Sequence, residues 1–337
     1  MIRVITSELA WKSELEDAYY DWYHTWDYHY LESEKSKSTP YLFIYEHGGA
    51  KIALPLLLNE INEKYSDFNS VYGYPGFIVY GDGTEDLIPG FIEELKLWCF
   101  KNNIVSVFTR LNSLVLNYKE IEPIGETVVI NLERTKDLQR ARYRKNNRNL
   151  INKLKNSGYS CSWDNSSQSL YDFMDIYNQT MTSLGAAESY YFSEVYFKSL
   201  LKSSDFHTRI YNCYFNGVTV CSGIFIFCND IVQYHLSGTL SEYKHAAPNR
   251  LMLDTVRNDA TDECYKLFHL GGGIGGRRDG LFDFKYSFSK EAIDFQVLKI
   301  ITNKEQYSNL SNISLDELKL CEDDFFPLYR KTDKMLK

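Results

Sequence analysis

The pattern of hydrophobic and polar residues predicts the same order of helices and strands in the two halves of the chain. In the first half, residues 7–34 carry apolar side chains at spacings of three and four, which predicts an amphipathic helix. Two apolar runs around His47-Gly48-Gly49 predict a β-hairpin, and residues 69–80 (NSVYGYPGFIVY) predict a strand bent at its glycines and proline. A helical pattern at 86–102 and the strands VSVFTRLN and TVVINL follow.

The second half repeats this order. After a basic helix expected to end at Gly158, the pattern predicts a strand at 159–163 and a helix at 170–182. Asn216-Gly217 lies between RIYNCYF and VTVCSGIFIF and is the strongest hairpin signal in the chain. A strand at 231–237, a helix at 249–264 and a strand at 266–270 complete the half. Both halves therefore read helix, hairpin, strand, helix, strand, which indicates a duplicated α/β domain.

Length and composition narrow the class of protein. A chain of 337 residues is long enough for two cores, and 44% apolar with 24% charged residues is typical of globular proteins. The N-terminus has no apolar segment of a secretory signal, so we expect a cytoplasmic protein without a transmembrane segment. Seven cysteines without a C-x-x-C pair favour buried free thiols, and we expect no metal site.

The distribution of charge is uneven. The net charge is −8, yet residues 134–155 carry nine basic side chains and only one acidic residue, Asp137. This local charge of +8 could bind a pyrophosphate-linked acceptor or an RNA backbone through residues such as Arg144 and Arg148. A solvated helix that pairs with the acidic remainder is the alternative.

A glycine-rich loop follows the last predicted strand. Gly271, Gly272, Gly273 and Gly275 precede two arginines, and Arg277 is placed to contact an anion. The glycines satisfy G-x-G-x-x-G formally, but no second βαβ half follows, so a dinucleotide site is disfavoured. A groove that holds an anionic donor is preferred, with a mobile surface loop as the alternative.

The order of these segments resembles two tandem GNAT-like (acyl-CoA N-acyltransferase-like) domains of the Fem family. Each domain would have a mixed central sheet flanked by helices, one over 1–133, with 305–337 as its possible completion, and one over 134–304. The resemblance is carried by DWYHTWDYHYLESEK, NSVYGYPGFI, RYRKNNRNLINKLKNSGY and HLGGGIGGRRDGLFDFKYSF, which occur in the family's order. The chain resembles a short form, because the basic helix meets Gly158 and a strand where well-known members insert a helical arm.

The resemblance implies an enzyme that transfers an acyl or aminoacyl group to an amine of a cell-envelope precursor. The acceptor would be a peptidoglycan peptide or an amino sugar of a surface polysaccharide, as a small molecule or linked to a lipid or nucleotide, with peripheral contact to a membrane. The resemblance to the Fem family places Lys285, within FDFKYSF, at the reaction centre, where it would stabilise the oxyanion. Asp283, His235 and Tyr243 are candidate proton acceptors, a substrate carboxylate or phosphate is the alternative, and the sequence does not choose among them.

The sequence does not determine the donor or the acceptor. No cofactor is expected to stay bound, and the donor is aminoacyl-tRNA or acyl-CoA, with tRNA as a possible partner. SEYKHAAPNRLM lacks the glycines of a CoA pyrophosphate loop. Phe284 and the glycine-rich loop would line the donor groove, and Tyr72 and Tyr74 would form an aromatic wall for the acceptor, or else pack in a core. A non-catalytic carbohydrate or peptide binder on the same fold is the alternative function.

Overall fold

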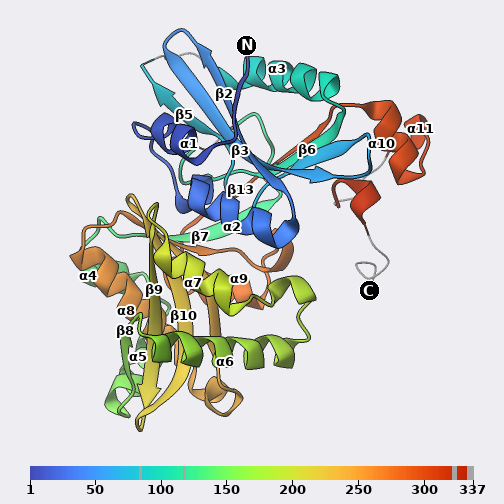
Figure 1. Ribbon diagram of the computed structural model, residues 1–337. Helices are drawn as coiled ribbons and strands as arrows, with labels where there is room; N and C mark the ends of the chain where they lie inside the picture. Colours follow the sequence, from blue (N-terminus) through green and yellow to red (C-terminus); the bar gives the residue numbers. More distant parts are fainter. Residues whose placement is uncertain (83–85, 117, 321–324, 332–337) are drawn as a thin grey trace. The chain divides into compact units, whose positions relative to one another are not determined.

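The computed structural model describes residues 1–82, 86–116, 118–320 and 325–331. The chain divides into two compact units (Figure 1). Unit 1 comprises Met1–Ile124 and Phe295–Lys337, and unit 2 comprises Gly125–Asp294. Among the described residues, no helix is both long and apolar enough to cross a membrane.

Unit 1 contains a mixed sheet in the order β1-β2-β3-β4-β6-β14, with β5 paired to β3. Neighbouring strands are antiparallel except β4 and β6, which are parallel. The strands are β1 (Arg3–Ile5), β2 (Thr39–His47), β3 (Ala50–Glu60), β4 (Ser66–Asn69), β5 (Ile78–Gly81), β6 (Ile104–Arg110) and β14 (Val297–Ile301). The α-helices are α1 (Glu8–Glu14), α2 (Trp26–Ser36), α3 (Ile88–Lys101), α10 (Lys304–Ser311) and α11 (Leu315–Leu320).

Unit 2 contains a second sheet, in the order β13-β7-β12-β11-β10-β9-β8. Its parallel pair is β11 and β12. The strands are β7 (Gly125–Asn131), β8 (Ser160–Trp163), β9 (His207–Phe215), β10 (Val218–Cys228), β11 (Ile231–Thr239), β12 (Leu267–Gly271) and β13 (Ala292–Phe295). The α-helices are α4 (Lys136–Ala141), α5 (Lys145–Asn156), α6 (Ser167–Leu184), α7 (Glu194–Lys202), α8 (Asn249–Asp262) and α9 (Gly280–Tyr286). Figure 1 shows α6 in front of β9 and β10, and α5 and α8 behind them.

The two units share one topology and exchange one strand. Each has a hairpin, a strand, a helix and a second strand parallel to the first, and an antiparallel strand then pairs beside that last strand. In unit 1 this added strand is β14, from late in the chain, whereas unit 2 uses β7. The expected boundaries at residues 133 and 304 therefore assign β7 and β14 to the domains whose sheets they do not join.

Two expected helices differ from the structure. Residues 7–34 form two α-helices, α1 and α2, because the chain turns between Leu15 and Thr25. The basic helix is also broken, into α4 and α5, because Arg144 has an extended ψ of 142°. Asp279 accepts a hydrogen bond from Phe282 N (2.8 Å) and begins helix α9, which carries most of the closing segment FDFKYSF.

Hydrophobic burial explains the agreement elsewhere. In unit 2, β10 and β12 bury Phe225, Phe227 and Phe268 completely, and α8 adds Met252 and Val256 to the same cluster. The Asn216-Gly217 hairpin forms as expected, since both residues have positive φ (50° and 77°). The mixed α/β class with a sheet in each half is thereby confirmed.

Candidate functional site

Strands β11 and β12 diverge within unit 2. They pair from Ile231 with Leu267 to Gln233 with His269, and the register ends there although β11 continues to Thr239. The register of β11 against β10 also shifts at this level, which leaves His235 as the extra residue of a bulge. Diverging strands and a bulge expose backbone groups that a ligand can reach, and such bulges are frequent beside active sites.

The glycine-rich loop begins where β12 ends. Gly271 has φ 76°, and a Cβ on Gly273 would lie 2.1 Å from the carbonyl oxygen of Arg277, so both positions require glycine. Asp279 ties the loop to helix α9, because it accepts hydrogen bonds from Ile274 N (2.9 Å) and Phe282 N. The loop is thus a tightly folded connection that brings α9 back beside β12.

Lys285 lies on α9 with its ammonium group against this loop. Its Nζ donates a hydrogen bond to the carbonyl oxygen of Gly272 (2.7 Å). Desolvation lowers the pKa of Lys285 to about 8, against a smaller opposing effect of Asp279. Beneath it, burial and the Lys285 charge lower the pKa of His269 to about 3, and Nδ1 of His269 is 2.7 Å from Oε1 of Gln233. A desolvated lysine next to diverging strands is a credible catalytic group.

The neighbours of Lys285 on α9 differ in exposure. The Asp283 side chain is 64% exposed and pairs with Arg144 (3.2 Å), so it is well solvated. Phe284 is half-buried and packs edge-on against Phe288, with ring centroids 5.5 Å apart. His235, at the bulge of β11, is also half-buried.

Arg250 is a residue that sequence reasoning missed. It lies in the first turn of α8, and its guanidinium carbon is 5.0 Å from the centroid of the Phe284 ring. Burial lowers the pKa of Arg250, and its Nε is buried without a hydrogen-bond partner among the described residues. A desolvated guanidinium that lacks a carboxylate partner is suited to an anionic ligand. Nothing in the local sequence distinguishes Arg250, because the surroundings of its guanidinium group include residues far away in the chain, such as Phe284.

The other expected donor and acceptor residues of unit 2 lie as follows. Arg277 is exposed, next to the glycine-rich loop. Arg148 donates to the carbonyl oxygens of Ala141 (2.9 Å) and Tyr143 (3.1 Å), and Arg144 is held by Asp283. Both acceptor candidates of the basic segment are thus already engaged within the unit.

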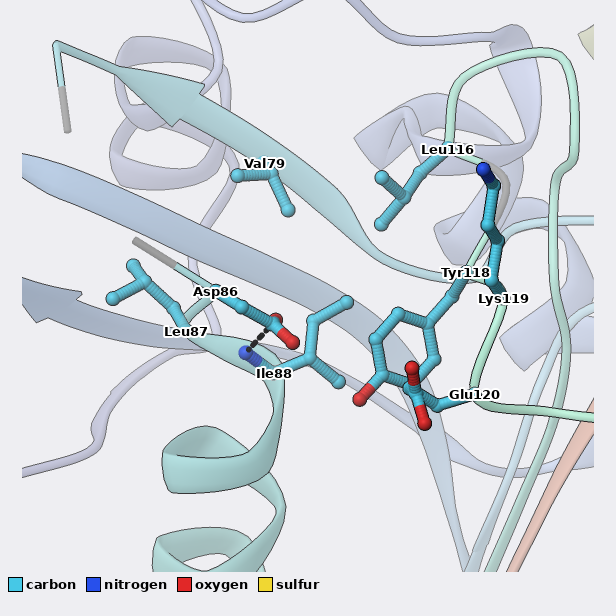
Figure 2. A pocket seen from close by; sticks show the side chains of 8 residues that line it. All are labelled: Val79, Asp86, Leu87, Ile88, Leu116, Tyr118, Lys119 and Glu120. Carbon is cyan, nitrogen blue, oxygen red and sulfur yellow. Dashed lines mark hydrogen bonds between the residues drawn. The ribbon is translucent and has the colours of Figure 1, made fainter. Parts of the chain in front are cut away.

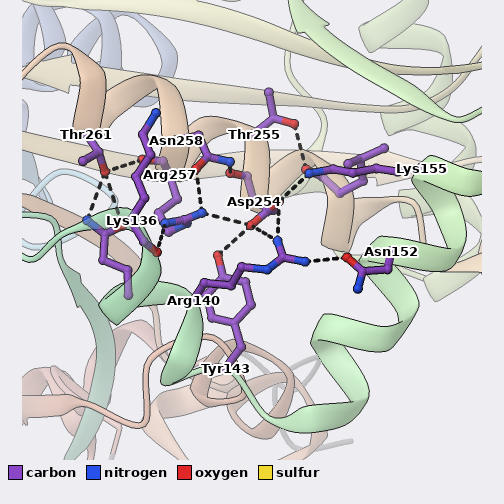
Figure 3. A network of polar contacts seen from close by, with 12 residues as sticks. Lys136, Arg140, Tyr143, Asn152, Lys155, Asp254, Thr255, Arg257, Asn258 and Thr261 are labelled. Atoms are coloured by element: carbon purple, nitrogen blue, oxygen red, sulfur yellow. Dashed lines mark hydrogen bonds and ion pairs between the residues drawn. The ribbon is translucent and has the colours of Figure 1, made fainter.

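The same holds for most of the basic segment 134–155. Six of its nine basic residues pair with carboxylates of unit 2, namely Arg134, Lys136, Arg140, Arg142, Arg144 and Lys155. Figure 3 shows the centre of these contacts, the fully buried Asp254 of α8. Asp254 accepts from Tyr143 (3.2 Å), Arg257 (3.2 Å), Lys155 (3.1 Å) and Arg140 (3.4 Å). Three of these ion pairs hold α4 and α5 onto α8, and the other three go to Glu291 and Asp283, so most of the positive charge of this segment is paired within unit 2.

The two tyrosines expected to bind the acceptor lie in unit 1. They follow β4 in an irregular stretch where the sequence predicted a strand, because Gly73 (φ 122°) and Gly76 (φ 63°) bend the backbone. Tyr72 is 45% exposed, and its carbonyl oxygen accepts a hydrogen bond from Tyr28. Tyr74 packs against the Phe295 ring (5.5 Å between centroids). Tyr72 is thus an exposed aromatic residue, whereas Tyr74 is partly used in packing.

Unit 1 has a hollow beside α3, the helix that corresponds to α8 of unit 2, and two carboxylates line it. It measures about 350 Å³ and lies at the start of α3, which follows β4 and β5 as α8 follows β11 (Figure 2). Asp86 and Glu120 line it together with Lys119 and Tyr118, and Asp86 accepts a hydrogen bond from Ile88 N (3.1 Å). Its carboxylates disfavour an anionic donor, which leaves unit 2 as the better place for one. No cluster of metal-binding side chains occurs within the described part of the chain.

Comparisons with known proteins concern the sequence of unit 2 and the fold of the whole chain. Residues 141–286, which include β11, α8, the glycine-rich loop and Lys285, match the acetyltransferase (GNAT) domain family. Comparison with the curated proteins finds no match. Among solved structures, FemX is similar at 11% identity and a TM-score of 0.67, over 91% of this chain and 99% of that chain.

Two further structures have a TM-score of 0.56. One is the C-terminal domain of a protein named as a lysylphosphatidylglycerol synthetase from Agrobacterium fabrum, with 10% identity over 90% of this chain and 93% of that chain. The other is a conserved protein of unknown function from Bacteroides thetaiotaomicron, with 11% identity over 89% and 100%. At these identities the likeness concerns the fold, while the GNAT match concerns the sequence of unit 2. Residues 141–286 therefore match the acetyltransferase (GNAT) domain family, and the fold of the chain is similar to that of FemX.

Proposed function

We propose that unit 2 transfers an acyl group from a phosphate-bearing donor to an amine, with Lys285 as the catalytic lysine. The observation that carries the proposal is the position of Lys285: its desolvated ammonium group lies at the end of β12, where β11 and β12 separate. Arg250 and Phe284 lie on the adjoining ends of α8 and α9 and supply an anion contact and an apolar wall.

The residues can be given roles in a balanced reaction. The acceptor amine attacks the donor carbonyl carbon, and the negative charge that develops on oxygen is stabilised by a hydrogen bond from protonated Lys285. With a pKa of about 8, most Lys285 side chains carry this proton at pH 7. The proton lost by the amine goes to a base, and the intermediate then expels the donor's leaving group. His235, half-buried at the bulge, is a better candidate base than the solvated, ion-paired Asp283.

The donor that we propose is an acyl-CoA. Two sequence features favoured aminoacyl-tRNA: the absence of glycines from SEYKHAAPNRLM, and the basic segment 134–155, most of whose cations are paired within unit 2. Arg250, without an ion-pair partner among the described residues, can instead contact one phosphate group of a compact donor. Aminoacyl-tRNA remains the alternative donor and is one arm of the test.

The acceptor that we propose is the amine of a cell-envelope precursor, either a peptidoglycan peptide or an amino sugar of a surface polysaccharide. The substrate class comes from the resemblance to the Fem family. The exposed ring of Tyr72 supports it, because an aromatic face is suited to stacking against a sugar or peptide. The acceptor could be linked to a nucleotide or a lipid, and a lipid-linked form would require peripheral contact with a membrane.

The test is a transfer assay with purified protein. Acetyl-CoA and charged tRNA are offered separately with a panel of amino sugars and peptidoglycan peptides, and release of free CoA or of deacylated tRNA is followed. Amine-dependent CoA release that is lost in Lys285→Ala, with unchanged circular dichroism, is the expected result. Unchanged turnover in Lys285→Ala would refute the role of this residue. Ligand binding without transfer from any donor would instead support a non-catalytic binding protein.

A further inference from the structure

The segment that follows Lys285 is held by the junction between α4 and α5. Residues 142–144 lie alongside residues 287–289, and the two segments run in opposite directions. Arg144 N donates to the carbonyl oxygen of Ser287 (2.8 Å), and the Tyr143 ring packs edge-on against Phe288 (5.1 Å between centroids). Arg142 Nε donates to the carbonyl oxygen of Ser289 (2.9 Å). We call these two segments, residues 142–147 and 287–289, the clamp.

Asn147 connects the clamp directly to the helix that carries Lys285. Its Nδ2 donates to the hydroxyl of Ser287 (2.7 Å), and this hydroxyl in turn donates to the carbonyl oxygen of Phe284 in α9. Asn147 is 1% exposed and Ser287 is 5% exposed, so water cannot replace these bonds easily. The link therefore fixes the last turn of α9.

Burying the side-chain amide of Asn147 lowers the stability of the folded protein. Its Oδ1 is buried and accepts no hydrogen bond from the described residues. A buried acceptor without a partner is destabilising, and an apolar side chain would avoid this penalty if only packing mattered. Tyr143 anchors the clamp as well, because its hydroxyl donates a hydrogen bond to the buried Asp254 (3.2 Å).

We infer that Asn147 is a positioning residue for Lys285, and that the basic segment 134–155 serves this site as a support rather than as a nucleic-acid surface. The inference rests on the proposed function, since positioning has a purpose only if Lys285 acts in transfer. A catalytic group must be held within a fraction of an ångström, and its hydrogen bonds must not loosen when charge develops. Two contacts hold Lys285 in this way: Gly272 holds its amine, and Asn147 holds its helix turn through Ser287.

The experiment uses Asn147→Ala in the full chain, with Asn149→Ala as the matched control. Asn149 is an exposed residue of the same helix, so both variants make the same chemical change. The reactivity of Lys285 toward acetic anhydride is measured by mass spectrometry from pH 6 to 11, which does not depend on any enzymatic activity. In wild type and Asn149→Ala the midpoint is expected near the pKa of about 8, and in Asn147→Ala it is expected to rise toward 10.5 as Lys285 gains access to water.

Kinetics and a second variant complete the test. With a working transfer assay, kcat of Asn147→Ala is expected to fall about 10- to 100-fold with KM nearly unchanged. Ser287→Ala breaks the same link and should act non-additively with Asn147→Ala, and it carries the test if Asn147→Ala does not fold. A folded variant with an unmoved Lys285 midpoint would overturn the inference. A shifted midpoint in a chain without transfer activity would leave the support intact and refute only the proposed function.

Discussion

Replacing Lys285 with methionine should stabilise the protein at neutral pH. Moving the lysine pKa from 10.5 to about 8 corresponds to roughly 3 kcal/mol of unfavourable free energy for the charged form in the folded state. Methionine has a similar length and no charge, but it loses the hydrogen bond to Gly272, worth about 1 kcal/mol. The net expectation for Lys285→Met at pH 7 is a gain of about 2 kcal/mol in the free energy of unfolding, together with loss of transfer.

The pH dependence of the free energy of unfolding separately tests the sign of the Lys285→Met effect. The folded pKa lies below the unfolded value, so the unfolded state binds more protons between about pH 8 and 10.5, and wild-type stability rises across this window. Lys285→Met lacks this rise, so its advantage should be full below pH 8, vanish at about pH 9.5 and become a deficit of about 1 kcal/mol by about pH 10.5, where only the lost hydrogen bond to Gly272 remains. Urea unfolding followed by tryptophan fluorescence at several pH values measures the difference, with the exposed Lys153→Met as control. A variant no more stable than wild type at pH 7, or a difference that is constant with pH, would refute the reasoning.

Three further changes test other parts of the account. Arg250→Gln should weaken binding of CoA by about 10- to 100-fold in calorimetry, because a charge-assisted bond to phosphate is lost, whereas Lys153→Gln should bind normally. Asp254→Asn should lower the free energy of unfolding by about 3 kcal/mol in urea, since the buried Arg257, the half-buried Arg140 and the exposed Lys155 lose their shared carboxylate; an unchanged midpoint would contradict its central place. Gly125→Ala places a Cβ 2.2 Å from the carbonyl oxygen of Gly276, so it should displace the glycine-rich loop and raise KM for the donor, and an unaltered KM would show that the loop does not contact it.

Local patterns were sufficient where one residue type or one period determines the backbone. The Asn216-Gly217 turn, the periodic helix α8 and the buried strand β12 formed as expected, because hairpin geometry and apolar spacing act over a few residues. The break between α4 and α5 could not be seen in this way. It places Tyr143 in a buried position where its hydroxyl reaches Asp254, more than 100 positions away in the chain.

The candidate site shows the same division. Lys285 and the glycine-rich loop were identified from a resemblance and from composition, and their roles stay predictions. The charge of the basic segment suggested a binding surface, yet its carboxylate partners, such as Glu291 and Asp254, come from distant elements that only the fold brings near. Arg250 escaped notice for the converse reason: its Nε has no hydrogen-bond partner within the described ranges, and this cannot be recognised before the neighbours are known.

The most direct test of the central claim is the pH dependence of transfer. The rate with acetyl-CoA is measured from pH 6 to 10, with an acceptor amine that is already neutral at pH 6, so that only groups of the enzyme titrate. If protonated Lys285 stabilises the oxyanion, kcat should fall as the pH rises through about 8, and Lys285→Met should show a low rate without this inflection. A rate that instead rises through pH 8 to a plateau, or an inflection that persists in Lys285→Met, would contradict the account.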